Sequence, residues 1–217
     1  MSILDIFKRK KQSNDDDGEE DEDNSCGDDT IDLKPMIYLY PRTKTEISVK
    51  LGHPERLITT YPEYGDGWTV VAEPNGNLRD ANNRGYYGLY WEGINQSYTE
   101  TDEGFIVAGG DVAKFLEEKL EILGLNEREI NEFIVFWLPI LSKNEYNYVR
   151  FATSDEIEND MSLKISPKPD ALIRVMMIVK PLEEPKDVRE QNLLAVKRDG
   201  YTAVEWGGTI LSEKTVK

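Results

Sequence analysis

Residues 171–179 read Ala-Leu-Ile-Arg-Val-Met-Met-Ile-Val, an apolar run that a single charged residue, Arg174, interrupts. A run of this kind is typical of a strand whose two faces are both covered by other parts of the protein. It therefore predicts a sheet with packing on each side. Arg174 either pairs with a carboxylate or lines a cleft, because an unpaired buried charge is costly.

Short β-type runs separated by turn residues continue on both sides of this stretch. They lie at 36–40, 45–51, 57–61, 68–73, 86–91, 105–108, 148–152, 161–165 and 201–206. Asp66-Gly67, between two of the runs, is a hairpin signal. The spacing is typical of antiparallel sheets, so we predict a strand-dominated α+β fold built on an antiparallel sheet or sandwich.

One main helix is expected over about 111–124, packed on this sheet. Asp111 can serve as its N-cap, and Gly124 is suited to end it after apolar residues at helical spacing. Asn126 and Glu129 then have the spacing of a capping box, which predicts a second, short helix.

The segment after the capping box leaves two alternatives open. Residues 133–138 are apolar on all sides up to Pro139. Periodicity alone does not separate a buried strand from the end of a helix in such a run.

Negative charge is concentrated at the N-terminal end of the chain. The 217 residues carry a formal net charge of −16, and residues 1–33 account for half of it. Eight carboxylates crowd between Asp15 and Asp23, repel one another and have no apolar surface to bury. Residues 12–32 are therefore predicted to be an acidic disordered linker, and residues 33–217 a single β-rich domain.

The first eleven residues form a short basic amphipathic segment, which we predict docks on a partner or on an anionic membrane surface. Four apolar side chains cover one side of a helical wheel, and four basic residues follow: Ile3, Leu4, Ile6, Phe7, Lys8, Arg9, Lys10 and Lys11. The alternative is a terminus without a role. The order of these groups is not that of a secretory signal, so we expect a cytoplasmic protein, with peripheral membrane contact as an option.

The composition excludes several classes of function. One Cys and one His cannot form a cysteine zinc site or a multi-histidine metal site, and we expect no metal and no cofactor. The glycine motifs that cradle phosphates and the nucleophile elbow of hydrolases are missing. The acidic balance disfavours nucleic acid, whose binding is largely electrostatic. An unidentified protein or a glycan remains as the expected partner.

The candidate site consists of aromatic residues beside carboxylates. Strand alternation separates residues 86–92 into a face of Tyr86, Tyr90 and Glu92 and a face of Tyr87, Leu89 and Trp91. The first face, on which Gly88 opens space, is suited to a sugar or a peptide. The expected ligand-binding residues are Tyr86, Tyr90, Glu92 and Arg174.

Glu92 and Glu205 allow two interpretations. As acid and base on either side of a glycosidic bond, they would make a carbohydrate-active hydrolase. As solvated or ion-paired side chains, they would leave a binding or structural module without catalysis. Arg174 is a natural partner for either glutamate, and a nearby cation lowers a carboxyl pKa, which makes a poor general acid. We favour the module and keep the hydrolase as the alternative.

Several motifs, in this order, resemble those of a family of uncharacterised bacterial and fungal proteins that begins with Lys-Pro-x-Ile-Tyr-Leu-Tyr-Pro. They are residues 34–41, Asp66-Gly67-Trp68, Tyr90-Trp91-Glu92, 133–139, 166–170 with 174–176, and Val204-Glu205-Trp206-Gly207. The resemblance covers about 34–211 and implies one domain. It implies no activity, so no catalytic residue is carried over from it.

Overall fold

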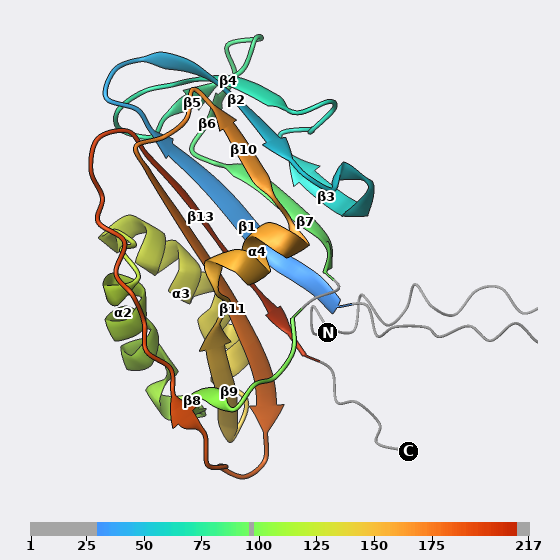
Figure 1. Cartoon of the computed structure of the whole chain (residues 1–217), viewed down its shortest axis with the longest axis vertical. Coiled ribbons are helices and arrows are strands. Elements are labelled where there is room, and N and C mark those ends of the chain that lie inside the picture. The colour runs from blue at the N-terminus through green and yellow to red at the C-terminus, as the bar shows by residue number, and fades with distance from the viewer. Residues whose placement is uncertain (1–29, 96–97, 212–217) are drawn as a thin grey trace, which may run out of the picture.

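The computed structural model describes residues 30–95 and 98–211, which form two sheets and three helices in a strand-dominated α+β fold (Figure 1). The larger sheet has eight strands, in the spatial order β12 (Arg189–Glu190), β8 (Glu103–Ala108), β9 (Tyr146–Phe151), β11 (Ala171–Leu182), β13 (Thr202–Ile210), β1 (Thr30–Tyr40), β7 (Leu89–Asn95) and β3 (Leu57–Tyr61). The smaller sheet has five, in the order β10 (Leu163–Ser166), β2 (Thr45–Leu51), β4 (Trp68–Ala72), β5 (Leu78–Arg79) and β6 (Gly85–Tyr86). Short 3-10 turns lie at η2 (Pro54–Arg56) and η3 (Gly109–Asp111). The predicted fold class is confirmed.

The larger sheet is mixed rather than purely antiparallel. Strand β11, which holds the apolar run around Arg174, pairs in parallel with β13 over its whole first part and antiparallel with β9. The two-residue strand β12 also pairs in parallel with β8. Parallel neighbours are joined by long connections, which leave no hairpin signal in the sequence.

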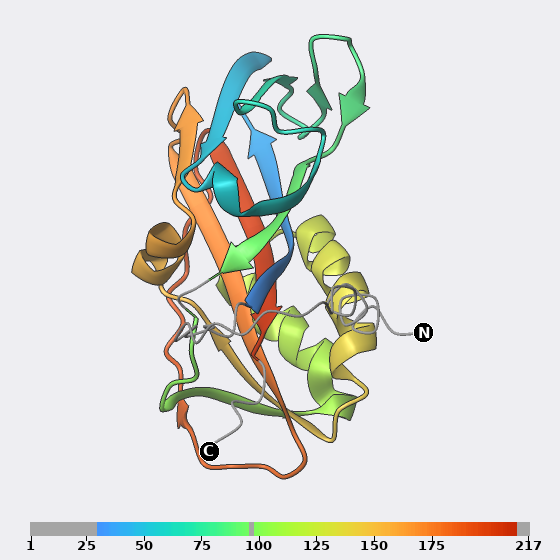
Figure 2. The same cartoon turned by 90° about the vertical axis from the view of Figure 1, so that its right-hand side faces the viewer.

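The helices lie on both faces of the larger sheet. Figure 2 shows α2 (Val112–Ile122) and α3 (Glu127–Leu141) on one side of the long strands and α4 (Ser154–Asp160) on the other. No helix among the described residues is long and apolar enough to cross a membrane.

The helical segment differs in its proportions from the expectation of one main helix over 111–124. The capping box is present, since Asn126 Oδ1 accepts from the Glu129 amide and the Glu129 carboxylate accepts from the Asn126 amide. The helix that it starts is the longer of the two and includes residues 133–138. Phe133, Trp137 and Leu141 recur every four residues and are fully buried, which makes this segment a helix and not a strand.

The two largest of three hydrophobic cores in the described residues lie on opposite faces of the larger sheet. One core, between that sheet and helices α2 and α3, holds Val204 and Trp206. The other, between the two sheets, holds Leu89 and Trp91. The four residues are all buried, as the strand alternation predicts, but they belong to two separate cores.

The first strand of the described residues begins three residues before the predicted boundary at residue 33. Strand β1 starts at Thr30 and pairs with β7 from that residue onward. Asp32, which was assigned to the acidic linker, is 1% exposed and accepts from the Asn95 side-chain amide. The predicted docking residues Ile3 to Lys11 lie outside the described residues.

Candidate ligand-binding cleft

A surface cleft of about 600 Å³ opens beside strand β7 on the face of the larger sheet that carries α3. Residues from β1, β3, β6, β7 and α3 and from the link between β6 and β7 line it. They are Lys34, Met36, Tyr61, Gly85, Tyr86, Tyr87, Gly88, Tyr90, Glu92 and Phe136. The lining is predominantly aromatic, with one carboxylate and one ammonium group.

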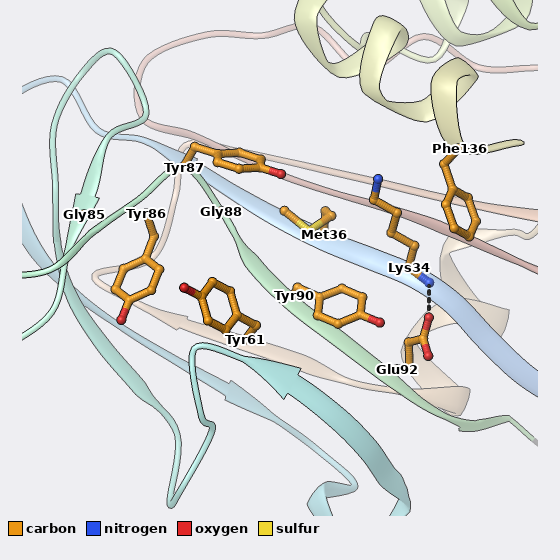
Figure 3. Close-up of a pocket in the computed structure, with 10 residues that line it drawn as sticks. All are labelled: Lys34, Met36, Tyr61, Gly85, Tyr86, Tyr87, Gly88, Tyr90, Glu92 and Phe136. Carbon is orange, nitrogen blue, oxygen red and sulfur yellow. Dashed lines mark hydrogen bonds between the residues drawn. The ribbon is translucent and has the colours of Figure 1, made fainter.

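The cleft has two walls (Figure 3). Tyr86, Tyr61, Tyr90 and Glu92 follow one another along one side, and Tyr87, Met36, Lys34 and Phe136 along the other. Tyr61 and Tyr87 are 51% and 47% exposed, so their rings are accessible without any rearrangement.

The link between β6 and β7 forms one end of the cleft because of Gly88. A Cβ atom at this position would lie 2.7 Å from Met36 Cε and 3.2 Å from the Ile37 carbonyl oxygen. Glycine lets the chain pass this close to β1, without displacing Met36, as it leaves the smaller sheet and enters the larger one. The strand alternation breaks here. Tyr87 therefore lies exposed in the cleft, and its predicted place on the face of Leu89 and Trp91 is wrong.

A bulge in β1 brings Lys34 to the other end. The register of β1 shifts between Leu33 and Met36 against β13 and between Asp32 and Met36 against β7. Lys34 has a φ of 51°, in the left-handed region. Bulges re-aim side chains in this way and recur beside functional sites. The Lys34 ammonium lies 5.1 Å from the ring centre of Phe136 and 5.6 Å from that of Trp206. Burial lowers the pKa of Lys34, and the charge of Glu132 acts in the opposite direction.

Tyr90 and Glu92 supply the polar groups at this end. Glu92 Oε1 accepts from the backbone amide of Lys34 at 3.3 Å, which holds the carboxylate at the mouth of the bulge. Burial raises the pKa of Tyr90, and the neighbouring charge of Glu92 raises it further. Tyr90 is therefore a neutral phenol at physiological pH, and Glu92 is available as an acceptor.

Tyr61 and Tyr86 are held in place at the opposite end. Their rings meet edge to face with centres 5.5 Å apart. Arg84 Nη2 donates to the Tyr61 hydroxyl at 2.9 Å, and the Tyr86 hydroxyl donates to Asp80 Oδ2 at 3.1 Å. These contacts fix the two rings before any ligand arrives, which lowers the entropy cost of binding.

Arg174 lies on the opposite face of the sheet and is committed to other contacts. Its Nε donates to Glu205 Oε2 at 2.7 Å, its Nη1 to Glu158 at 3.0 Å, and its Nη2 to the Met161 carbonyl at 2.7 Å. Arg174 and Glu205 occupy the same level of the parallel pair β11 and β13. The expected carboxylate partner of Arg174 is thus Glu205, and Arg174 does not line the cleft as predicted.

Glu205 cannot join Glu92 in one active site. Its other oxygen accepts from Trp91 Nε1 at 3.0 Å, and the residue is 1% exposed. Trp91, and with it Glu205, faces the core between the two sheets. Tyr90, which is two residues from Glu92 and shares its face of β7, packs on the opposite core. The two glutamates therefore point to opposite faces of the sheet. This geometry excludes Glu92 and Glu205 as the acid and base of one hydrolase site, because both carboxyls would have to flank the same bond.

The cleft brings together three of the four residues that the sequence predicted for ligand binding: Tyr86, Tyr90 and Glu92. Five further residues with side chains in the cleft were not predicted: Lys34, Met36, Tyr61, Tyr87 and Phe136. A Lys-Pro pair interrupting a strand was the one local signal for a bulge. Tyr61 and Phe136 reach the cleft through tertiary packing alone.

Among the described residues, no group of three or more His, Cys, Asp or Glu side chains is arranged to hold a metal ion. The fold and the cleft together define a two-sheet α+β protein with a tyrosine-lined surface cleft. No family model and no solved structure matches the chain.

The family of the chain is shown by its similarity to a curated protein. The chain is 40% identical over 95 residues to a protein of Butyrivibrio fibrisolvens named "Uncharacterized protein in bglA 3'region". The match covers 42% of this chain and 95% of that protein. The chain belongs to the same family as this uncharacterised protein.

Proposed function

We propose that the protein is a non-catalytic binding module whose cleft takes a linear oligosaccharide. The observation that carries the proposal is the row of Tyr86, Tyr61 and Tyr90 that ends at Glu92 (Figure 3). The apolar face of a sugar ring packs on aromatic rings, and its hydroxyls donate to carboxylates and exchange hydrogen bonds with phenols. Sites of this kind combine aromatic walls with a few polar groups that fix orientation.

The row of rings supports an extended ligand rather than a compact one. The tyrosines succeed one another from the Arg84 end of the cleft to the Lys34 end, so successive sugar units would meet successive rings. Tyr61 and Tyr86 are already fixed by Arg84 and Asp80, which favours binding by a preformed surface.

The absence of a second carboxyl in the lining favours binding over hydrolysis. Glu92 is the one carboxylate among the ten lining residues. Glycosidases need two carboxyls about 5–9.5 Å apart around the scissile bond. Glu205 is on the far side of the sheet and is bonded to Arg174.

A panel of linear oligosaccharides, tested by calorimetric titration, examines the proposal. We expect at least one oligosaccharide to bind, and to bind about tenfold or more weakly to Tyr61→Ala and to Tyr87→Ala, because each change removes an accessible ring. A tenfold change in affinity corresponds to about 1.4 kcal/mol of binding free energy. The control is Leu194→Ala, which removes an apolar side chain that is 76% exposed and outside the lining. Loss in the control alone, or no binding of any oligosaccharide, contradicts the proposal.

The N-terminal segment supports a second, separate proposal, namely that it docks the protein on anionic membranes. The supporting observation is the sequence itself, in which Lys8, Arg9, Lys10 and Lys11 follow Ile3, Leu4, Ile6 and Phe7. Each basic residue contributes about 1 kcal/mol near an anionic surface. Co-sedimentation with anionic vesicles should be lost in Phe7→Asp and weakened by salt, and equal binding to neutral vesicles would remove the proposal.

A further inference from the structure

We propose that the ligand of the cleft is an anionic saccharide, whose carboxylate pairs with the ammonium group of Lys34. This inference rests on the proposed function and adds the charge of the ligand to it. It follows from the way in which the cleft displays positive charge in a chain whose net charge is −16.

The Lys34 ammonium is a half-buried cation that forms no ion pair within the described part of the chain, and Glu132 is the carboxylate whose charge reaches it. Within the described part of the chain, no carboxylate forms an ion pair with it, and its Nζ makes no hydrogen bond. The ammonium group lies instead beside the rings of Phe136 and Trp206. Ring faces attract a cation but accept no conventional hydrogen bond from its three donors, so an incoming carboxylate oxygen would gain contacts that the free protein lacks.

The neighbouring carboxylates are already engaged. Glu132 accepts from the Tyr38 hydroxyl at 2.6 Å and from Arg128 Nε at 3.0 Å. Glu92 accepts from the backbone amide of Lys34, and Figure 3 shows the Lys34 side chain extending away from it along the other wall. Neither carboxylate forms an ion pair with the Lys34 ammonium, and Lys34 is among the residues that line the cleft.

The backbone holds this cation in position. A left-handed φ is costly for a residue other than glycine. Lys34 has such a φ at the point where β1 shifts its register against both of its neighbours. Pro35 fits against Gly207 of β13, where a Cβ would come within 3.0 Å of the proline ring. The packing thus fixes the backbone at the bulge, so only the side chain of Lys34 has to be ordered when the ligand binds.

A second cation lies at the other end of the tyrosine row. The Arg84 guanidinium sits 5.9 Å from the ring centres of both Tyr61 and Tyr86. Asp80 lies close to Arg84 and offsets part of its charge, so Lys34 is the principal determinant. Positive groups at both ends suit a sugar chain that carries carboxylates on more than one unit.

The test uses matched pairs of linear tetrasaccharides with glucose, mannose or galactose backbones, each neutral and in its C6-oxidised, carboxylate-bearing form. Calorimetric titration of the full chain at low salt should give, for at least one sugar backbone, about fivefold higher affinity for the acidic form than for the neutral form. A difference of this size corresponds to the free energy that a partly exposed ion pair contributes. Lys34→Met should abolish the preference, and Lys34→Arg should retain it. Higher salt should reduce it.

Lys164→Met is the matched control, because it removes an exposed lysine from β10, outside the cleft, with the same change in net charge. A preference that survives in Lys34→Met overturns the inference, and so does a preference that falls equally in Lys164→Met. Equal affinity for neutral and acidic forms also overturns it and leaves oligosaccharide binding intact. Failure of every tetrasaccharide to bind overturns the proposed function itself. Thermal melts of each variant confirm that the titrated protein is folded.

Discussion

Glu92 and Glu205 lie on opposite faces of the eight-stranded sheet, Glu92 in the cleft and Glu205 in a buried ion pair with Arg174. Each glutamate is next to a tryptophan in the sequence, and both lie in the same sheet, on strands β7 and β13 that are separated by β1. Their different orientations assign them different roles. Glu205 holds the sheet together from one side, and Glu92 is available to a ligand on the other.

Glu205→Gln should destabilise the protein by about 3 kcal/mol, because it leaves the Arg174 guanidinium, whose side chain is 8% exposed, without its buried counter-charge. Glu158→Gln removes the other carboxylate of Arg174, which is 58% exposed, and should cost under about 1 kcal/mol. Equilibrium urea unfolding of both variants measures the difference. Equal stability of Glu205→Gln and the wild type would show that the pair contributes nothing.

Asp32→Asn should change how stability depends on pH. Burial raises the pKa of Asp32 well above its usual range, and the nearby Asp160 adds to the rise. Since the folded protein then holds a proton that the unfolded chain releases, the stability contribution of Asp32 is complete below the unfolded pKa of about 3.9 and is lost as pH rises through the folded pKa.

Urea midpoints across this pH range therefore should fall less steeply for Asp32→Asn than for the wild type. Glu117→Gln, a change at an exposed position of α2, should follow the wild-type profile. Parallel profiles for all three proteins would contradict the assigned cause.

Gly207→Ala should cost about 1–3 kcal/mol, because the added methyl group would overlap the backbone and ring of Pro35. The same change at Gly110, where a Cβ meets nothing within 4 Å, should be nearly neutral. Thermal melts compare the two. Since Pro35 fixes the bulge at Lys34, Gly207→Ala should also weaken ligand binding in the protein that remains folded. Equal melting temperatures would mean that the bulge tolerates displacement.

Shortening the chain to start at Asp29 should leave stability unchanged, because the removed acidic stretch offers little apolar surface. A start at Leu33 should cost more than about 1 kcal/mol, since it removes the Asp32 partner of the buried Asn95 amide and the first three residues of β1, which pair with β7. Urea unfolding of the two shortened proteins tests this. Equal stability of both would return the domain boundary to residue 33.

The local parts of this fold could be predicted, and the long-range parts could not. The capping box at Asn126 is a three-residue relationship, and the Gly124 stop, with a φ of 87°, is a single-residue one. Both are encoded where they occur. Other features join segments that are far apart in the chain, namely the parallel pairing of β11 with β13 and the position of β1 between β13 and β7. No local sequence pattern predicts such pairings.

The same distinction applies to the cleft. Tyr90 and Glu92 share a strand, and alternation was enough to put them on one face. Alternation failed at Tyr87, because the chain changes sheets at Gly88 and the period of two does not continue through that point. Lys34 was missed because its place in the cleft depends on the packing of Phe136 of α3 beside β1, which joins segments far apart in the chain.

Backbone amide NMR of the nitrogen-labelled full chain during titration with the neutral and acidic tetrasaccharides tests the central claim, that the cleft binds a sugar, most directly. We predict that shift changes concentrate at Lys34, Gly85, Gly88 and Tyr90, and that Leu163 to Ser166 of β10, outside the cleft, stay unchanged. Changes confined to residues outside the cleft, or no change with any of the sugars, would contradict the account.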